Sequence, residues 1–553
     1  MSGDEGRGES SARTRGGAVA RRACVLVGLL FLVAAAFLIA RSSFVASDGQ
    51  RYFVVNDDAF ISLRYAWNLG HGHGLVWNEG ERVEGFTNPL WTLYASAWSL
   101  VLSRRILPLA MQLSGVLLLL GQAVICARIV RAALAQRGRE SSWMETAAFA
   151  MPLACYPLVH WSVQGLEVCL VGFWVTLAVF LWVRDRPIAM AIALGLAFWT
   201  RHDTAVPAAV IMGMAGLNAL HDRRRSRLWL KACGVLGGMV AAVFVARLAY
   251  YGRAWPNTYV LRMARFPMAD RIALNGWGYI TPYLLENAVP IALALGMLVF
   301  RWTRLRAMLA AIVLSMVAYS VYVGGDPHPY WRFLAPYTPL LGLILLADAP
   351  DAAAAGLRLR RMAQVMTLFL VWLAAGVAPF VITANCPDWA QRSNIEIALR
   401  LNRLLKPGAS VGVLHAGTLP YYTDFRAVDF LGKCDKHIAR RPPHLADAPP
   451  SWDGMQSVPG HNKYDLEYSI ADRQPTYIQS YWWAGQNMRD YVVDHYAFVH
   501  VGVETHYTSR FVMLRRDSPA VRWELTGLPR VSGASGFVSH GRSGHAEVPQ
   551  SRL

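Results

Sequence analysis

The chain has 553 residues, of which 54% are hydrophobic and only 16% charged, with a formal net charge of +18 at pH 7. Soluble domains carry about 25% charged residues, so this composition excludes an ordinary soluble protein and indicates a membrane protein with several spans. The excess positive charge could suit nucleic acid, but the arginines gather at the ends of apolar segments, as the positive-inside rule requires. We therefore expect the lipid bilayer as a partner, and no nucleic acid.

The apolar segments are long enough to be placed as helices that cross a bilayer, each of ~20 residues. Residues 1–22 are small, polar and rich in arginine, which predicts a disordered cytoplasmic tail, and a first span follows at residues 23–40. Ten further spans are expected at residues 108–127, 144–163, 168–183, 188–201, 204–220, 229–250, 283–300, 307–323, 333–348 and 362–383. The sequence thus predicts a polytopic α-helical membrane protein with about eleven transmembrane helices, in a membrane domain of residues 23–384.

The arginine count of the connecting loops predicts the orientation. Clusters such as Arg223, Arg224 and Arg225 fall on the same side as the N-terminus, and the opposite loops carry fewer basic residues. The N-terminus is therefore expected in the cytoplasm, with the chain in the cytoplasmic (inner) membrane. The first outer loop, residues 42–107, and the C-terminal region then lie outside the cytoplasm.

The first outer loop contains the polar stretch Asn56–Trp91, which opens with two adjacent acids, Asp57 and Asp58. Apolar residues follow at helical spacing, and the run ends at the GHGHG of Gly70–Gly74. This pattern predicts a short amphipathic helix lying on the membrane, followed by a loop over it. Acids beside a membrane-covered cleft are candidates for catalysis.

Simpler interpretations of these residues remain open. Asn56 or Asp57 could cap the helix, an interpretation as well supported by spacing as catalysis, although two acids exceed what one cap needs. His71 and His73 could bind a metal, but two histidines in a glycine-rich loop are weak evidence, and we expect no metal.

The C-terminal region, residues 385–528, has ordinary polarity and predicts an extracytoplasmic α/β domain. A helix is expected at residues 395–405, and short strands at residues 410–414, 427–430, 476–478, 498–501 and 511–514. Residues 529–553 are expected to be disordered. Whether Cys386 and Cys434 form a disulfide is left open by the sequence.

The remaining polar groups that are unusual for a membrane protein fall at the predicted outer ends of spans. They are Gln164, Glu167, Arg201, Asp203, Asn257, Tyr259, Arg262, Asp326, His328 and Arg332. Charges near the bilayer are costly, so they indicate a polar pocket at the membrane surface. Pairing of Arg201 with Asp203, or of Asp326 with Arg332, is an equally good structural explanation, and Glu167 is better explained as an acid at a helix start. The arginines suit phosphate oxygens.

These motifs resemble those of GT-C membrane glycosyltransferases, and most of all the terminal arabinofuranosyltransferases of the AftB type. The similarity rests on the first outer loop, GLE at Gly165–Glu167, TRHD at Thr200–Asp203, YYG and PNT within Tyr250–Thr258, GGD and RFLAP within Gly324–Pro336, AVDFLGKCDKHIAR, and GHNK at Gly460–Lys463. It covers about residues 50–470. The chain departs from the family at TRHD, where an Arg-Pro-acid turn is more usual, and at Arg262, where lysine is usual.

The resemblance implies transfer of a sugar, arabinofuranose in the first instance, from a polyprenyl monophosphate to an acceptor hydroxyl on a glycan or glycolipid, with inversion and without a metal or other cofactor. It implies a base in the first loop, Asp57 or, as second choice, Asp58. Arg201, Arg262 and Arg332 are the candidate contacts to the donor phosphate. The expected pocket also includes Arg64, Glu84, Asn88, Glu167, Asp203, Asn257 and Asp326, with His461 and Lys463 reaching over it.

Other functions remain as alternatives. The same fold could transfer another sugar to lipopolysaccharide, capsule or a protein. A transporter would place its polar groups at the middle of the membrane, and not at the outer ends of spans. A non-enzymatic assembly protein could keep the scaffold without the two acids, which are present here.

Overall fold

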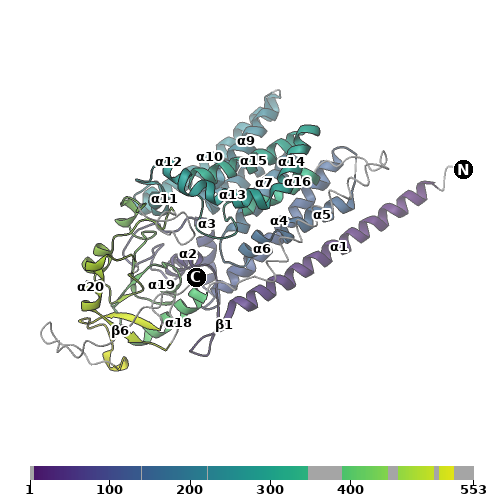
Figure 1. Ribbon diagram of the computed structural model, residues 1–553. Helices are drawn as coiled ribbons and strands as arrows, with labels where there is room; N and C mark the ends of the chain where they lie inside the picture. Colours follow the sequence, from purple (N-terminus) through teal and green to yellow (C-terminus); the bar gives the residue numbers. More distant parts are fainter. Residues whose placement is uncertain are drawn as a thin grey trace.

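The computed structural model describes residues 5–138, 140–220, 222–346, 389–445, 459–481, 483–502 and 510–527. Most of the helices run together in one bundle, with α1 along its edge, and the C-terminal elements cover one end of that bundle (Figure 1). The expected span at 362–383, the tail at 529–553 and Cys386 lie outside the described residues. Helix α1 (Glu5–Ser42) begins inside the segment 1–22 that we expected to be disordered. Extending a formed helix is much easier than starting one, which explains this difference.

Four described helices are long and apolar enough to cross a membrane: α1 from Arg21, α4 (Leu107–Ala135), α10 (Arg223–Tyr251) and α15 (Arg304–Tyr322). A fifth is possible if α12 (Met268–Asp270), α13 (Trp277–Glu286) and α14 (Ala288–Phe300), which bend by 78° at one break, form one span. Shorter apolar helices fill the bundle: α5 (Ser142–Ala154), α6 (Tyr156–Ser162), α7 (Val168–Val183), α8 (Pro187–Thr200), α9 (Ala205–Ala219) and α16 (Thr338–Leu346).

Two expected spans are each broken into two helices. Residues 144–163 form α5 and α6, which separate at Cys155, where the backbone is extended between Pro152 and Pro157. Residues 283–300 are divided at Asn287 between α13 and α14. Proline removes a backbone donor and crowds the preceding turn, so a continuous apolar run need not be one helix. Hydropathy alone therefore predicts the apolar segments but not their breaks.

The first outer segment starts with a hairpin, β1 (Ser43–Val45) and β2 (Arg51–Phe53), followed by α2 (Asp57–Gly70), whose cap is Asn56, and α3 (Pro89–Ser99). We expected α2 to be amphipathic and to lie on the membrane. Instead, nine of the ten residues from Asp57 to Ala66 are buried, so this part of the helix is covered on all sides. The C-terminal region supplies the cover: the Phe60 ring lies 5.3 Å from that of Tyr421 and 5.5 Å from that of Tyr422.

The C-terminal region contains α18 (Trp389–Leu404), α19 (Thr418–Tyr422), α20 (Gln486–His495) and a five-stranded mixed sheet. Its strands are β3 (Ser410–Val413), β4 (Arg426–Asp429), β5 (Tyr477–Ile478), β6 (Tyr496–His500) and β7 (Phe511–Arg515), in the order β4-β3-β5-β7-β6. Strand β3 pairs in parallel with β4 and β5, whereas β7 is antiparallel to β5 and β6. All five predicted strands are confirmed. One hydrophobic core runs from α2 into this sheet, so the two parts of the chain are packed as a unit.

Candidate functional site

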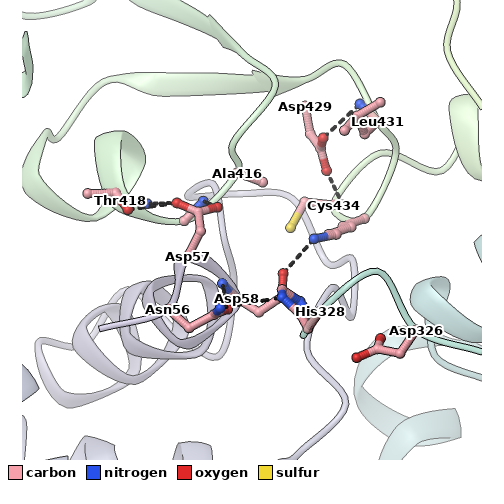
Figure 2. A network of polar contacts seen from close by, with 12 residues as sticks. Asn56, Asp57, Asp58, Asp326, His328, Ala416, Thr418, Asp429, Leu431 and Cys434 are labelled. Atoms are coloured by element: carbon pink, nitrogen blue, oxygen red, sulfur yellow. Dashed lines mark hydrogen bonds and ion pairs between the residues drawn. The ribbon is translucent and has the colours of Figure 1, made fainter. Parts of the chain in front are cut away.

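The two acids at the start of α2 face different neighbours. Asp57 accepts three hydrogen bonds from the C-terminal region: from the Gly417 N–H (3.0 Å), the Thr418 N–H (2.8 Å) and the Thr418 hydroxyl (2.6 Å). The cap of α2 is Asn56, whose side chain accepts from the Asp58 N–H at 3.0 Å. Figure 2 shows Asp57 turned toward Thr418, while Asp58 faces His328. Asp57 therefore joins two parts of the chain.

Asp58 is surrounded by cationic and imidazole groups from three segments. Its Oδ1 lies 2.5 Å from Lys433 Nζ, and its Oδ2 lies 2.9 Å from His328 Nε2 and 3.0 Å from an Arg332 nitrogen. We call Asp58, His328, Arg332 and Lys433 the Asp58 cluster. Burial by itself raises the pKa of Asp58, but Lys433, His328 and Arg332 together outweigh it and hold that pKa well below its usual range. The carboxylate is therefore ionised at neutral pH.

Arg332 links the Asp58 cluster to a second buried acid. It donates to Asp326 Oδ1 at 2.8 Å, and Arg262 approaches the same oxygen at 3.4 Å. The Asp326 side chain is fully buried, whereas the side chains of the Asp58 cluster and of Arg262 keep 13–19% of their surface exposed. The cluster is therefore partly accessible, while Asp326 is closed off and pairs with both arginines.

A third group of charges lies deeper. Arg201 pairs with Asp203 at 2.8 Å and approaches Glu167 at 3.6 Å, and all three side chains are buried. Asn88 donates to Glu167 at 2.7 Å and accepts from Ser62 and Thr92. The two terminal nitrogens of Arg201 have no hydrogen-bond partner within the described residues. The expected pairing with Asp203 is therefore present, together with unused donors.

The three candidate phosphate-binding arginines meet at one aromatic ring. The guanidinium carbons of Arg201, Arg262 and Arg332 lie 5.5, 5.3 and 5.8 Å from the centre of the Phe333 ring. Cation–π attraction holds such groups on an aromatic face and partly offsets their mutual repulsion. Arginines from the end of α8, from α11 (Asn257–Met263) and from the loop after α15 thus converge on one point.

Two other expected pocket residues hold the surrounding backbone. Arg64 donates to the carbonyls of Trp77, Pro420 and Phe425, which fastens α2 to the C-terminal region. Asn257 donates to three carbonyls in the segment 432–435. Both side chains are buried. Asn257 therefore positions the backbone of Lys433, and Arg64 positions the C-terminal segment that packs on α2.

Glu84 forms a separate buried ion pair with Arg247, at 2.8 Å, and Arg247 also contacts His202 at 2.7 Å. Burial raises the pKa of Glu84 to about 7, although Arg247 acts in the opposite direction. This pair is built between the first outer segment and α10. It is connected to the Asp58 cluster through Asn257. The Glu84 carbonyl accepts from the Asn257 N–H at 3.0 Å, and the Asn257 side chain holds the segment 432–435, which contains Lys433.

The two residues from the GHNK motif differ in what they face. Burial and then the charge of Lys433 hold the pKa of His461 well below its ordinary value; Asp58 acts in the opposite direction, and His328 adds to the lowering. His461 therefore lies within electrostatic reach of the Asp58 cluster. Lys463 is buried, donates to the carbonyls of Ala264 and Ala439, and has its pKa lowered by burial to about 8.

Some residues of the site were not singled out by sequence reasoning. Lys433 lies within the quoted motif AVDFLGKCDKHIAR, but no spacing rule connects it with Asp58, which is 375 residues away in the chain. Phe333 follows Arg332, and the sequence alone gives no reason to distinguish it from other apolar residues. His328 was part of a polar group, and only the fold shows its contact with Asp58. The signal that pointed to Lys433 was the motif itself.

The histidines of the glycine-rich loop lie apart from this site. The His73 Nδ1 atom lies 3.3 Å from Glu79 Oε1, and the His71 ring stacks on that of Trp67 with their centres 3.9 Å apart. Among the residues that the structure describes, no group of three or more His, Cys, Asp or Glu side chains could hold a metal ion. Cys434 is buried, and its sulfur accepts from the Tyr65 hydroxyl at 3.8 Å.

The overall fold is similar to one that is known from solved structures. The structure resembles ArnT from Cupriavidus metallidurans, with a TM-score of 0.51 to the apo structure and 0.50 to the complex with undecaprenyl phosphate. Each alignment covers 88% of this chain and 97% of ArnT at 13% sequence identity, which shows the fold alone. The chain thus has the GT-C fold.

The sequence is similar to two proteins named terminal beta-(1->2)-arabinofuranosyltransferase. The one from Corynebacterium glutamicum is 29% identical over 269 residues, 44% of this chain and 38% of the relative. The one from Mycobacterium tuberculosis is 29% identical over 264 residues, 45% of this chain and 41% of the relative. The matched stretch thus spans about two fifths of each relative. Residues 385–524 match a domain of unknown function, DUF8728.

Proposed function

We propose that this chain is an inverting glycosyltransferase that moves a sugar, arabinofuranose, from a polyprenyl monophosphate to a hydroxyl of a cell-envelope glycan. The observation that carries the proposal is the gathering of Arg201, Arg262 and Arg332 around Phe333, next to the partly exposed carboxylate of Asp58. The similarity to arabinofuranosyltransferases supports the sugar, and the fold shared with an undecaprenyl-phosphate-binding protein supports the lipid carrier.

The chemistry needs one acid and several cations. The acceptor oxygen attacks the anomeric carbon while the bond from that carbon to the phosphate oxygen breaks, and the phosphate departs with the bonding electrons. Arg262 and Arg332 stabilise the charge that builds on the phosphate, and the unused donors of Arg201 lie behind them. The acceptor proton passes to a carboxylate. Of the two acids, Asp58 has the better contacts for this role, because Asp57 is fully engaged with Gly417 and Thr418.

We further propose that the N-terminus lies in the cytoplasm, with the site and the C-terminal α/β region on the outer side of the cytoplasmic membrane. The loops rich in arginine support this orientation. A donor with a lipid tail would then enter from the bilayer, and a glycan acceptor from the aqueous side.

Membranes containing the chain should be supplied with synthetic polyprenyl-phospho-arabinose and a panel of glycan acceptors. Transfer with inverted configuration, lost in Asp58→Asn, supports the proposal. Arg332→Ala should raise the donor KM more than the acceptor KM. If no acceptor receives arabinose, but another polyprenyl-phospho-sugar is used as donor, the choice of sugar is overturned. Absence of transfer from any such donor would overturn the function.

A further inference from the structure

Lys433 is carried by a tightly organised loop that follows β4. The Asp429 carboxylate accepts from the N–H groups of Leu431 (2.9 Å), Gly432 (3.2 Å) and Cys434 (2.7 Å), so one side chain shapes the whole turn. Gly432 has φ of +78°, a conformation that residues with a Cβ rarely adopt. The local sequence thus fixes the backbone from which Lys433 projects.

The membrane part of the chain holds the same loop from the other side. The Asn257 side-chain amide donates to the carbonyls of Gly432 (2.9 Å), Lys433 (3.0 Å) and Asp435 (3.1 Å). A Cβ on Gly85 would come within 3.0 Å of the Lys433 carbonyl, so this glycine permits close approach of the first outer segment. Such placement from two sides is typical of a residue whose position matters.

Lys433 is not needed to join the two parts of the chain. Other contacts make that junction: Asp57 with Gly417 and Thr418, and the Trp77 indole N–H with the Ala416 carbonyl at 3.1 Å. The shared apolar core adds to them. The ion pair of Lys433 with Asp58 therefore calls for a different explanation.

We propose that Lys433 is a further phosphate-binding residue of this site, which the C-terminal region supplies and which shares its ammonium group between Asp58 and the donor phosphate. The inference rests on the proposed function. Lys433, His328 and Arg332 aim donors at one carboxylate, and each is 13–17% exposed. A phosphate oxygen accepts from the same donors, and an ammonium group has three N–H bonds, so it can contact both anions.

This role has a consequence for Asp58. Apart from burial, the charge of Lys433 is the largest influence on the pKa of Asp58, which it lowers. A phosphate that attracts the ammonium group weakens this effect and makes the Asp58 carboxylate a better proton acceptor during transfer. Lys433 would then couple donor binding to the basicity of Asp58.

The experiment compares wild type, Lys433→Met, Lys433→Arg and the control Lys436→Met, each as the full chain in lipid nanodiscs. Undecaprenyl phosphate is the binding probe, and kcat, the KM values for donor and acceptor, the pH profile and the melting temperature are measured. Lys433→Met should weaken probe binding and raise the donor KM by about tenfold to a hundredfold, the worth of a charge-assisted hydrogen bond. The acceptor KM and melting temperature should stay unchanged, and the acidic limb of the pH profile should move to higher pH.

Lys433→Arg should restore most of the donor affinity, because it keeps the charge, and Lys436→Met should behave as wild type. The proposal is overturned if Lys433→Met matches Lys436→Met in donor KM, probe affinity and pH profile. A large fall in melting temperature that Lys433→Arg does not correct also overturns it, in favour of a structural tether. If wild type neither binds the probe nor transfers sugar, the proposed function fails, whereas transfer without any effect at Lys433 removes this inference alone.

Discussion

Asp57 and Asp58 are adjacent in the chain, but their carboxylates belong to different parts of the molecule. Asp57 accepts three hydrogen bonds from Gly417 and Thr418, while Asp58 contacts Lys433, His328 and Arg332. Successive side chains of a helix point ~100° apart, which places the two acids on separate faces of α2. One face meets the C-terminal backbone, and the other meets the loop after α15, which carries His328 and Arg332.

The two acids should therefore respond differently to the same substitution. Asp58→Asn should lower kcat by about 10²–10⁴-fold, the usual contribution of a general base, with little change in melting temperature. Asp57→Asn should instead destabilise the fold by about 1–3 kcal/mol, because a carboxylate that accepts three hydrogen bonds is replaced by a group that also donates. Thermal unfolding and transfer kinetics in detergent would be compared. Equal kinetic losses at unchanged stability would contradict this division of roles.

Asn257 should be important for the position of the segment 432–435. Asn257→Ala removes an amide that contacts three carbonyls of that segment with two N–H bonds, for an expected loss of about 2 kcal/mol at about 1 kcal/mol for each N–H. Thr258→Val is the matched control, because the neighbouring Thr258 hydroxyl is buried and has no hydrogen-bond partner within the described residues. Chemical unfolding would measure both variants. A stability for Asn257→Ala equal to that of Thr258→Val would show that the segment does not depend on this amide.

Gly417 allows the C-terminal region to approach the start of α2. A Cβ at this position would collide with the Asp57 backbone carbonyl, and backbone cannot move aside as a flexible side chain can. Gly417→Ala should cost about 1–3 kcal/mol or more and reduce transfer by displacing α19 from α2. At Gly485, with φ of −65°, a Cβ meets nothing within 4 Å, so Gly485→Ala should leave both stability and transfer near wild type. Similar melting temperatures for the two variants would be inconsistent with this close approach.

Asp429 gives the fold a predictable response to pH. Burial raises the pKa of Asp429 to about 6, against the lowering effect of the N–H donors of Cys434 and Leu431. The folded state then holds a proton that the unfolded chain releases near pH ~4, so this residue's contribution to stability falls as pH rises from about 4 to about 6.

Asp429→Asn removes that titration. Relative to this variant, wild type should lose up to about 3 kcal/mol between pH 4 and pH 6 and show a constant difference above pH 7, since one pKa unit equals ~1.4 kcal/mol. Denaturant unfolding at several pH values and constant ionic strength would measure the difference. A difference independent of pH would mean that Asp429 titrates in its ordinary range.

The sequence predicts well what depends on local pattern. The five strands, the helix at Asp57 and its end near Gly70 follow from periodicity and turn residues, and the structure confirms them. The breaks at Cys155 and Asn287 and the burial of α2 depend on neighbours that hydropathy does not reveal. Lys433 and Phe333 could not be assigned for the same reason: the partners that define their roles come from other segments, and only the fold brings them together.

The shared core of α2 and the C-terminal sheet has a consequence for biogenesis. Ribosomes make α2 early, yet the residues that cover it, Tyr421 and Tyr422, are made more than 350 positions later. A nascent or truncated chain that stops before α18 would leave the apolar faces of α2 open and Asp58 without Lys433. Maturation of the first loop thus waits until the last quarter of the polypeptide has been made and has folded against it, and premature termination yields a product that quality-control proteases can recognise by its uncovered helix.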